Sequence, residues 1–351
     1  MKVRATQAIL ECLLEQEVDT VFGYPGGTIL NLYDELYHYQ DKIHHILTAH
    51  EQGASHAADG YARSTGKVGV CFATSGPGAT NLTTGIATAY MDSSPVVFIT
   101  CNVTEETLGK DAFQEVDITG IAMPITKATY LVRDPQTIPD VMRQAFAVAA
   151  TGRPGPVLID IPIDVQEQSL KKFYYPEEVS IRGYKPSVKG NDLQIKRVVE
   201  AISRSKQPLI CAGGGVWLAD AKEELLELAE RCSIPVVKTM MGLGLLPTDH
   251  PLNMGMIGAH GNHCANKALA KADLLIMVGT RAADRAMVDP GEIQRRMATI
   301  HIDVDPAEIG KNMQAAIPLV GNVKVILRQI LDRDVAATDS AAWLEKLRDY
   351  R

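Results

Sequence analysis

Four clusters of glycine, acidic and hydroxyl residues in the first 120 positions have types and spacing suited to ligand binding. They read FGYPGG at 22–27, HEQGASHAADGYAR at 50–63, ATSGPGATN at 73–81 and DAFQEVD at 111–117. The first and third lie where a short apolar run changes into a helical pattern, and glycines there let the backbone approach a ligand closely. Taken alone, the first cluster could equally be a plain tight turn, and the fourth is uninformative by spacing.

Glu51 has the clearest chemistry of these residues. It stands at the junction of an apolar run and a helical segment rich in small residues, which indicates close packing against another element, such as a subunit or a cofactor. A carboxylate held in such a place would be desolvated, as a proton-shuttling acid requires. The alternative is a glutamate that merely favours the positive end of a helix dipole. The 73–81 turn lacks the lysine of a Walker loop, which argues against a P-loop nucleotide site.

The second half of the chain contains a different glycine turn. An apolar run, 208–212, leads into Gly213-Gly214-Gly215, which resembles a dinucleotide-binding turn without its full spacing because position 218 is leucine. Further polar clusters follow, with sequences KTMMGLG at 238–244, GAHG at 258–261, GTRAADR at 279–285 and HIDVDP at 301–306. His260 and Cys264 have a helical spacing, but no third and fourth ligand match it, so we predict no metal site in this chain.

Composition excludes several classes of function. The 351 residues carry a net charge of −7, which argues against nucleic acid or an anionic membrane as a partner. No apolar run is long enough to span a bilayer, and the N-terminus has neither a signal-peptide nor a transit-peptide pattern. The six cysteines form no C-x-x-C pair and most lie in apolar runs, so we expect buried free thiols and a cytoplasmic protein.

Short apolar runs alternate with helical patterns, which predicts the α/β class with two doubly wound parallel-sheet domains. We expect a first domain at 1–165, a polar linker at 166–190, a second domain at 191–335 and a further linker at 336–351 with a short helix around Trp343. Strands are expected at 20–22, 43–47, 68–73, 96–100, 157–161, 208–212, 235–238, 274–278 and 299–304. Helices are expected at 5–15, 28–37, 53–64, 81–91, 139–150, 193–203, 219–232 and 323–331.

The clusters above, with AYMDSSPV at 89–96 and TGRPGPVLIDIP at 151–162, resemble in sequence and order the large catalytic subunits of acetolactate synthases. That family depends on thiamine diphosphate, and the resemblance covers essentially the whole chain. It implies that residues 1–165 bind the cofactor's pyrimidine across a dimer interface. Glu51 would then be the activating carboxylate, whose proton on the pyrimidine N1′ promotes loss of the thiazolium C2 proton. Gln114 and Phe113 match positions near the reacting centre, or could be structural loop residues; Pro25, Gly26 and Gly27 match a loop against the cofactor.

The resemblance also implies that the Rossmann-like second domain binds FAD, which is not used for redox chemistry in the main reaction. Arginines suit the pyrophosphate, and a carboxylate at a strand end suits the adenosine ribose. The family's usual Arg-Phe-Asp-Asp-Arg reads RAADR at 281–285 here, and a late aspartate is Asn322, so we expect weaker FAD binding. The positions that match FAD contacts are Arg153, Gly213, Gly214, Thr239, Met240, His260, Gly279, Arg281, Arg285 and Asp303.

In this family a third domain holds the Mg²⁺ that clamps the diphosphate, through a Gly-Asp-Gly motif that this chain lacks. We therefore expect Mg²⁺ only through an absent third domain and no carboligation by the chain alone. The expected activity is decarboxylation of pyruvate and ligation to a second 2-keto acid, in branched-chain amino acid biosynthesis, by a homodimer or larger assembly with a possible regulatory small subunit. Two alternatives stay open: another thiamine-diphosphate-dependent 2-keto-acid decarboxylase or carboligase, and a non-catalytic module that binds FAD or a subunit.

Overall fold

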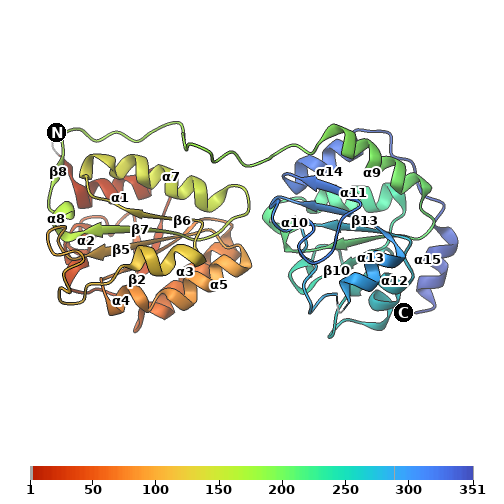
Figure 1. Ribbon diagram of the computed structural model, residues 1–351, viewed down its shortest axis with the longest axis horizontal. Helices are drawn as coiled ribbons and strands as arrows, with labels where there is room; N and C mark the ends of the chain where they lie inside the picture. Colours follow the sequence, from red (N-terminus) through yellow and green to blue (C-terminus); the bar gives the residue numbers. More distant parts are fainter. Residues whose placement is uncertain (1–2, 288, 351) are drawn as a thin grey trace. The chain divides into compact units, whose positions relative to one another are not determined.

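The computed structural model describes residues 3–287 and 289–350, and the chain divides into two compact units, 1–184 and 185–351. Each unit is built on a six-stranded sheet in which every neighbouring pair is parallel, with helices on both faces (Figure 1). The predicted α/β class with two doubly wound sheets is confirmed.

The first sheet has the order β3-β2-β4-β5-β7-β6. From β2 the chain adds β3 on one side and then returns to add β4 on the other side of β2. At such a switch point the connections leave in opposite directions, so a crevice opens at the carboxyl ends of β2 and β4. The strands are β2 (Thr20–Gly23), β3 (His44–Leu47), β4 (Gly69–Ala73), β5 (Val96–Asn102), β6 (Ala128–Leu131) and β7 (Val157–Pro162).

Both faces of this sheet are buried, because successive side chains of each strand point to opposite sides. Val70 and Phe72 of β4 pack with the core under α1 (Ala5–Glu15), α2 (Leu30–Tyr37) and α7 (Ile138–Ala150). Cys71 and Ala73 face α3 (Glu51–Thr65) and α5 (Thr83–Asp92), on the other side (Figure 1). The small residues of α3 pack on β4 and α5 of this same unit: Gly69 lies against the Ala58 carbonyl. The predicted close packing against another element is confirmed for Ala54 and Ala58, which are fully buried, and packing against a subunit or cofactor stays a prediction.

The predicted linker starts too early. Gln166 ends α8 (Ile163–Gln166) as a buried residue, and β8 (Ser169–Leu170) pairs antiparallel with β1 (Val3–Arg4). Tyr184 still belongs to the first unit, where its hydroxyl donates to the Thr151 carbonyl at 2.8 Å. The polar composition of this segment is typical of a linker, but its aromatic side chains pack against the first core and attach the irregular segment to it.

The second sheet has the order β11-β10-β9-β12-β13-β14. Numbered along the chain this is 3-2-1-4-5-6, the arrangement of dinucleotide-binding sheets, and its switch point lies between β9 and β12. We did not predict β11 and β14. The strands are β9 (Pro208–Ala212), β10 (Val236–Lys238), β11 (Asn253–Met256), β12 (Leu274–Val278), β13 (Ala298–Asp303) and β14 (Ile317–Val320).

In Figure 1 the helices α9 (Asp192–Arg204), α11 (Lys222–Cys232) and α14 (Val323–Leu331) cover one face of this sheet. The other face carries α12 (His263–Lys271), α13 (Pro290–Arg296) and α15 (Ala341–Arg348). The predicted short helix around Trp343 is confirmed as α15, but it belongs to the second unit rather than to a linker, because Trp343 is buried in this core and its indole N–H donates to the Pro208 carbonyl at 3.1 Å.

Several short helices complete the two units. They are η1 (Gly27–Ile29), α4 (Pro77–Thr80), α6 (Ile118–Ala122), η2 (Met123–Ile125), η3 (Pro135–Thr137), α10 (Gly214–Leu218) and η4 (Met240–Gly242). All six cysteines are buried free thiols, as predicted. Among the residues that the structure describes, no helix has the length and apolar character needed to cross a bilayer.

Candidate cofactor sites at the two switch points

In the first unit, one threonine hydroxyl joins the turns that follow β2 and β4 to each other and to the end of β5. Thr28 Oγ1 accepts from the Ser75 N–H at 3.0 Å, donates to the Cys101 carbonyl at 2.5 Å and lies 2.9 Å from Thr74 Oγ1. Gln166 donates to the Thr28 carbonyl at 3.0 Å. These bonds hold the first and third predicted clusters together at the crevice.

The glycines of these turns allow a close approach. A Cβ at Gly26 would lie 2.6 Å from Thr74 Cβ, and a Cβ at Gly78 would lie 2.6 Å from Thr74 Cγ2. Gly27 is exposed and has nothing within 4 Å of its Cβ position. Pro25 is half-buried beside it. The predicted loop therefore packs tightly on Thr74 at Gly26 and is open at Gly27.

Glu51 is the first residue of α3, and its side chain is 8% exposed. The helix is capped by His50, whose Nδ1 accepts from the Gln52 N–H at 3.0 Å. The Glu51 carboxylate instead extends to the turn after β4, where Asn81 Nδ2 donates to Oε2 at 2.9 Å. A Cβ at Gly78 would lie 3.1 Å from Oε1. Glu51 therefore does more than begin a helix, because its buried carboxylate is part of the crevice.

Gln114 and Phe113 lie on the loop after β5. The backbone of Gln114 lies against Gly76, where a Cβ would come within 2.8 Å of the Gln114 carbonyl carbon. Phe113 is 86% exposed. The loop is attached at its far end by Asn102, whose amide donates to the Val116 carbonyl at 3.2 Å. The structure brings the main chain of the fourth cluster to the third one, while the Phe113 ring points to solvent.

A buried carboxylate that we did not predict, Asp160, supports this loop. Asp160 of β7 accepts from Asn102 Nδ2 and from Thr100 Oγ1, both at 2.7 Å. Burial raises the pKa of Asp160 above its ordinary value. The available signal was an acidic residue inside an otherwise apolar strand, VLIDIP. Asp160 acts on the loop only through Asn102.

In the second unit the two predicted glycine turns meet at the switch point. The Gly213 N–H donates to the Val278 carbonyl at 3.0 Å, and the Gly215 N–H donates to the Gly279 carbonyl at 2.9 Å. A Cβ at Gly279, which has φ +54°, would lie 2.7 Å from Gly215 Cα. Side chains larger than hydrogen therefore do not fit between these turns.

The turn after β10 lies beside them. The Thr239 N–H donates to the Ala212 carbonyl at 3.0 Å, and a Cβ at Gly214 would lie 3.0 Å from Met241 Cβ. Met240 is exposed on η4. Of the predicted FAD positions, Thr239, Met240, Gly213, Gly214 and Gly279 are thus gathered at neighbouring strand ends.

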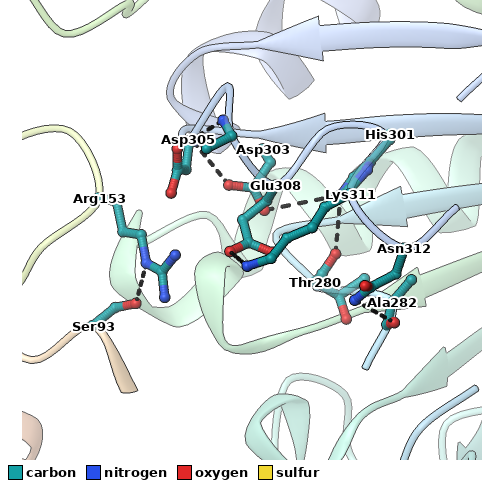
Figure 2. Close-up of polar contacts among 11 residues, drawn as sticks. Ser93, Arg153, Thr280, Ala282, His301, Asp303, Asp305, Glu308, Lys311 and Asn312 are labelled. Atoms are coloured by element: carbon teal, nitrogen blue, oxygen red, sulfur yellow. Dashed lines mark hydrogen bonds and ion pairs between the residues drawn. The ribbon is translucent and has the colours of Figure 1, made fainter. Parts of the chain in front are cut away.

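Asp303 occupies the carboxyl end of β13 (Figure 2), where its Oδ1 accepts from the Asp305 N–H at 2.9 Å. His301, on the same strand, donates from Nε2 to the Thr280 carbonyl at 3.0 Å and so connects this strand to the turn after β12. Burial raises the pKa of the Asp303 carboxyl and lowers the pKa of His301. A buried carboxylate at a strand end is the group that a ribose hydroxyl would meet.

The remaining predicted FAD positions are His260, Arg281 and Arg285 of the second unit and Arg153 of the first unit. The backbone of Gly258 lies against the Arg285 carbonyl, which also accepts from the Ala259 N–H at 3.2 Å. His260 and Arg285 are exposed, and Arg281 is half-buried. Arg153 belongs to the first unit, where its Nε donates to Ser93 Oγ at 2.9 Å (Figure 2).

Lys238, the last residue of β10, was not predicted as special. It is 4% exposed, and no side-chain partner is found for it among the residues that the structure describes. Burial lowers the pKa of this lysine. Within the described ranges 3–287 and 289–350, no group of three or more His, Cys, Asp or Glu residues could hold a metal ion.

Comparison with known proteins agrees with this division. Residues 3–121 match the N-terminal TPP binding domain of thiamine pyrophosphate enzymes, and residues 195–330 match the central domain of the same enzymes. The chain is 49% identical over 353 residues to a probable acetolactate synthase large subunit of Methanocaldococcus jannaschii, covering 99% of this chain and 59% of that protein. It is 47% identical over 354 residues to the acetolactate synthase large subunit of Corynebacterium glutamicum, covering 100% of this chain and 56% of that protein.

The chain thus spans less than two thirds of the length of these relatives. The two family matches fall one on each sheet and together cover both switch points. The chain belongs to the thiamine pyrophosphate enzymes, of which it carries the N-terminal and central domains.

Proposed function

We propose that this chain forms part of an acetolactate synthase, which decarboxylates pyruvate and joins the product to a second 2-keto acid, either pyruvate or 2-ketobutyrate. The observation that supports this most directly is the buried Glu51 carboxylate in the crevice between β2 and β4, beside glycine turns that approach within van der Waals contact. The naming of the two relatives as acetolactate synthase large subunits supports the same substrate class.

The residues of this crevice fit the pyrimidine of thiamine diphosphate. Glu51 Oε1 adjoins Gly78, which has no side chain to cover it, and Ser75 Oγ is buried without a hydrogen-bond partner among the described residues. Glu51 would hold a proton at Oε1 and donate it to a ring nitrogen, while Pro25, Gly26 and Gly27 would lie along the ring. When bound, the cofactor supplies the electron sink for decarboxylation. Gln114 and Phe113 would approach the reacting atoms from their loop.

The test of this proposal is Glu51→Gln in a fusion of this chain with the remaining C-terminal part of the relative from Methanocaldococcus jannaschii. We expect acetolactate formation from pyruvate to fall by about 100-fold or more, because loss of a positioned proton donor typically costs 10²–10⁴-fold. Glu15→Gln, at an exposed position on α1, is the matched control and should leave the rate unchanged. Near-wild-type product formation by Glu51→Gln would refute the assignment.

We also propose that the second unit binds FAD. The 3-2-1-4-5-6 strand order, the glycine contacts at the switch point and the buried Asp303 support a dinucleotide whose ribose meets Asp303. Arg281 and Arg285 of this unit would neutralise the pyrophosphate. The measurement is a fluorescence titration with FAD, in which Asp303→Asn should weaken binding about 10-fold, the order of one hydrogen bond to a charged group. Asp249→Asn, on an exposed loop, should not; no response to FAD by the unaltered chain would refute the proposal.

Assembly and surroundings complete the proposal. Tyr24, Leu30, Leu47 and Met91 are large apolar residues exposed on the first unit, which supports a homodimer or larger assembly with a possible regulatory small subunit. The six buried free thiols support a reducing cytoplasm. Mg²⁺ would be held by residues outside these 351. Analytical ultracentrifugation would test the assembly, and a monomer at micromolar concentration would contradict it.

A further inference from the structure

Asn81 is placed to form a hydrogen bond with the carboxylate of Glu51. It is the residue that ends α4, and its N–H donates to the Pro77 carbonyl at 3.0 Å. The next residue, Leu82, is fully buried in the core between the sheet and α5. Because the backbone is fixed on both sides, the amide is held where its Nδ2 donates to Glu51 Oε2 at 2.9 Å.

This contact makes the two oxygens of Glu51 unequal. An amide N–H pairs with a lone pair on oxygen, and the carbonyl oxygen of a protonated carboxyl is a better acceptor than its hydroxyl oxygen. Since Asn81 donates to Oε2, protonation at Oε2 would leave this hydrogen bond with the weaker acceptor. The contact therefore favours the proton on Oε1.

Oε1 is the oxygen that a ligand can reach. It adjoins Gly78, where a Cβ would come within 3.1 Å of it and within 2.6 Å of Thr74 Cγ2. A residue with a side chain at position 78 would cover this oxygen, whereas glycine leaves it bare. The same turn thus carries both the group that occupies Oε2 and the residue that leaves Oε1 uncovered.

We infer that Asn81 is a positioning residue that directs the proton of Glu51 to Oε1, toward the ring nitrogen of the bound pyrimidine. The inference rests on the proposed function of Glu51. Asn81 itself touches no reacting atom. It acts by donating to one oxygen of the carboxyl, which favours protonation of the other oxygen.

Two substitutions test this in the fusion protein. Asn81→Ala removes the donor, and Asn81→Asp keeps the shape but replaces a donor with a second carboxylate. The readout is the rate of deuterium exchange at the thiazolium C2 of bound thiamine diphosphate, followed by NMR after acid quench. We expect exchange about 10-fold slower in Asn81→Ala and about 100-fold slower in Asn81→Asp, because a hydrogen bond to a charged group is worth roughly one to two orders of magnitude.

A second readout needs no cofactor. With ¹³C-carboxyl glutamate, the infrared carboxylate band of Glu51, assigned by its loss in Glu51→Gln, should shift in Asn81→Ala because Oε2 loses a donor. Thr80→Ala is the matched control: it removes the 3.1 Å bond from Thr80 Oγ1 to the Pro77 carbonyl on the same turn without touching Glu51. Thr80→Ala should leave the band and the exchange rate unchanged.

The outcomes separate this inference from the function beneath it. If Glu51→Gln exchanges as fast as wild type, the proposed function fails. If Glu51→Gln is slow but both Asn81 variants exchange normally, only the role of Asn81 is overturned. It is also overturned if thiamine diphosphate affinity, measured by calorimetry, falls by the same factor as the exchange rate, since that pattern indicates a disrupted site. Slow exchange with affinity changed less than about 3-fold supports positioning.

Discussion

The two sheets open at similar switch points, but their turns are joined by different kinds of contact. In the first unit side chains connect the turns, through the Thr28 hydroxyl and the pair of Asn81 with Glu51. In the second unit the bonds run between main-chain groups, from the Gly213 N–H to the Val278 carbonyl and from the Gly215 N–H to the Gly279 carbonyl. Where side chains connect the turns, their polar groups can also bind a ligand. Where main-chain groups of glycines connect the turns, no side chain projects from them, and an extended ligand can lie against the backbone.

The difference extends to what lies over each crevice. The loop that carries Gln114 lies on Gly76 and is attached through Asn102, so it could move without disturbing the sheet. Gly279 lies between two strands of the second sheet, and its N–H donates to the Ile302 carbonyl at 2.9 Å. We expect a displaced loop to affect chemistry more than stability, and a displaced sheet turn to affect stability more than chemistry.

The largest loss of stability is expected for Gly279→Ala. An alanine here is strained because φ is +54°, and its Cβ would lie only 2.7 Å from Gly215 Cα. Together, the backbone strain and the overpacking should lower the free energy of unfolding of the second unit by about 4 kcal/mol. Urea unfolding measures this. Gly310→Ala is the control, since φ is +82° there but nothing lies within 4 Å, and it should cost about 1 kcal/mol. Equal losses of stability in the two variants would show that the contact with Gly215 does not contribute to the cost of Gly279→Ala.

A smaller loss of stability but a larger loss of activity is expected for Gly76→Ala. The residue has φ +56° and ψ −120°, and its new Cβ would press on the Gln114 carbonyl. Because the loop can shift away, we expect about 2 kcal/mol of destabilisation and at least a 10-fold slower reaction in the fusion protein. The control is Gly66→Ala, at φ +73° with nothing within 4 Å. Unchanged activity in Gly76→Ala would mean that the loop has no part in the reaction.

The smallest effect is a gain in stability, from Lys238→Met. A buried ammonium without a partner among the described residues is costly, and an apolar side chain of similar volume should stabilise the second unit by about 1 kcal/mol at pH 7. Burial lowers the pKa of Lys238, so the unfolded chain binds more protons and the wild type regains stability as the pH rises toward 10.5. The gain should therefore shrink between pH 7 and pH 10.5. Calorimetry tests this, with exposed Lys206→Met as the control; a loss of stability would contradict it.

Much of the fold was readable in the sequence because parallel strands are continuous apolar runs. β9, β12 and α14 begin and end where the pattern predicted, and the remaining predicted strands differ by a few residues at their ends. β6, β11 and β14 were missed, because short segments such as ATYL and NMGM carry mixed polar residues. All three are edge strands, which pair with a neighbouring strand on one side only.

Residue types and their order alone identified the glycine turns, the candidate carboxylate Glu51 and the family resemblance. These features depend on residues that are consecutive in the sequence. Only the tertiary structure decided which oxygen of Glu51 is occupied, that Asp160 supports the Gln114 loop, that Lys238 is buried without a described partner and that Trp343 packs into the second core. Those facts depend on pairs of residues that lie 30, 58 and 135 positions apart. Which residues form such pairs depends on the spatial order of the strands in each sheet. No local pattern along the chain specifies that order.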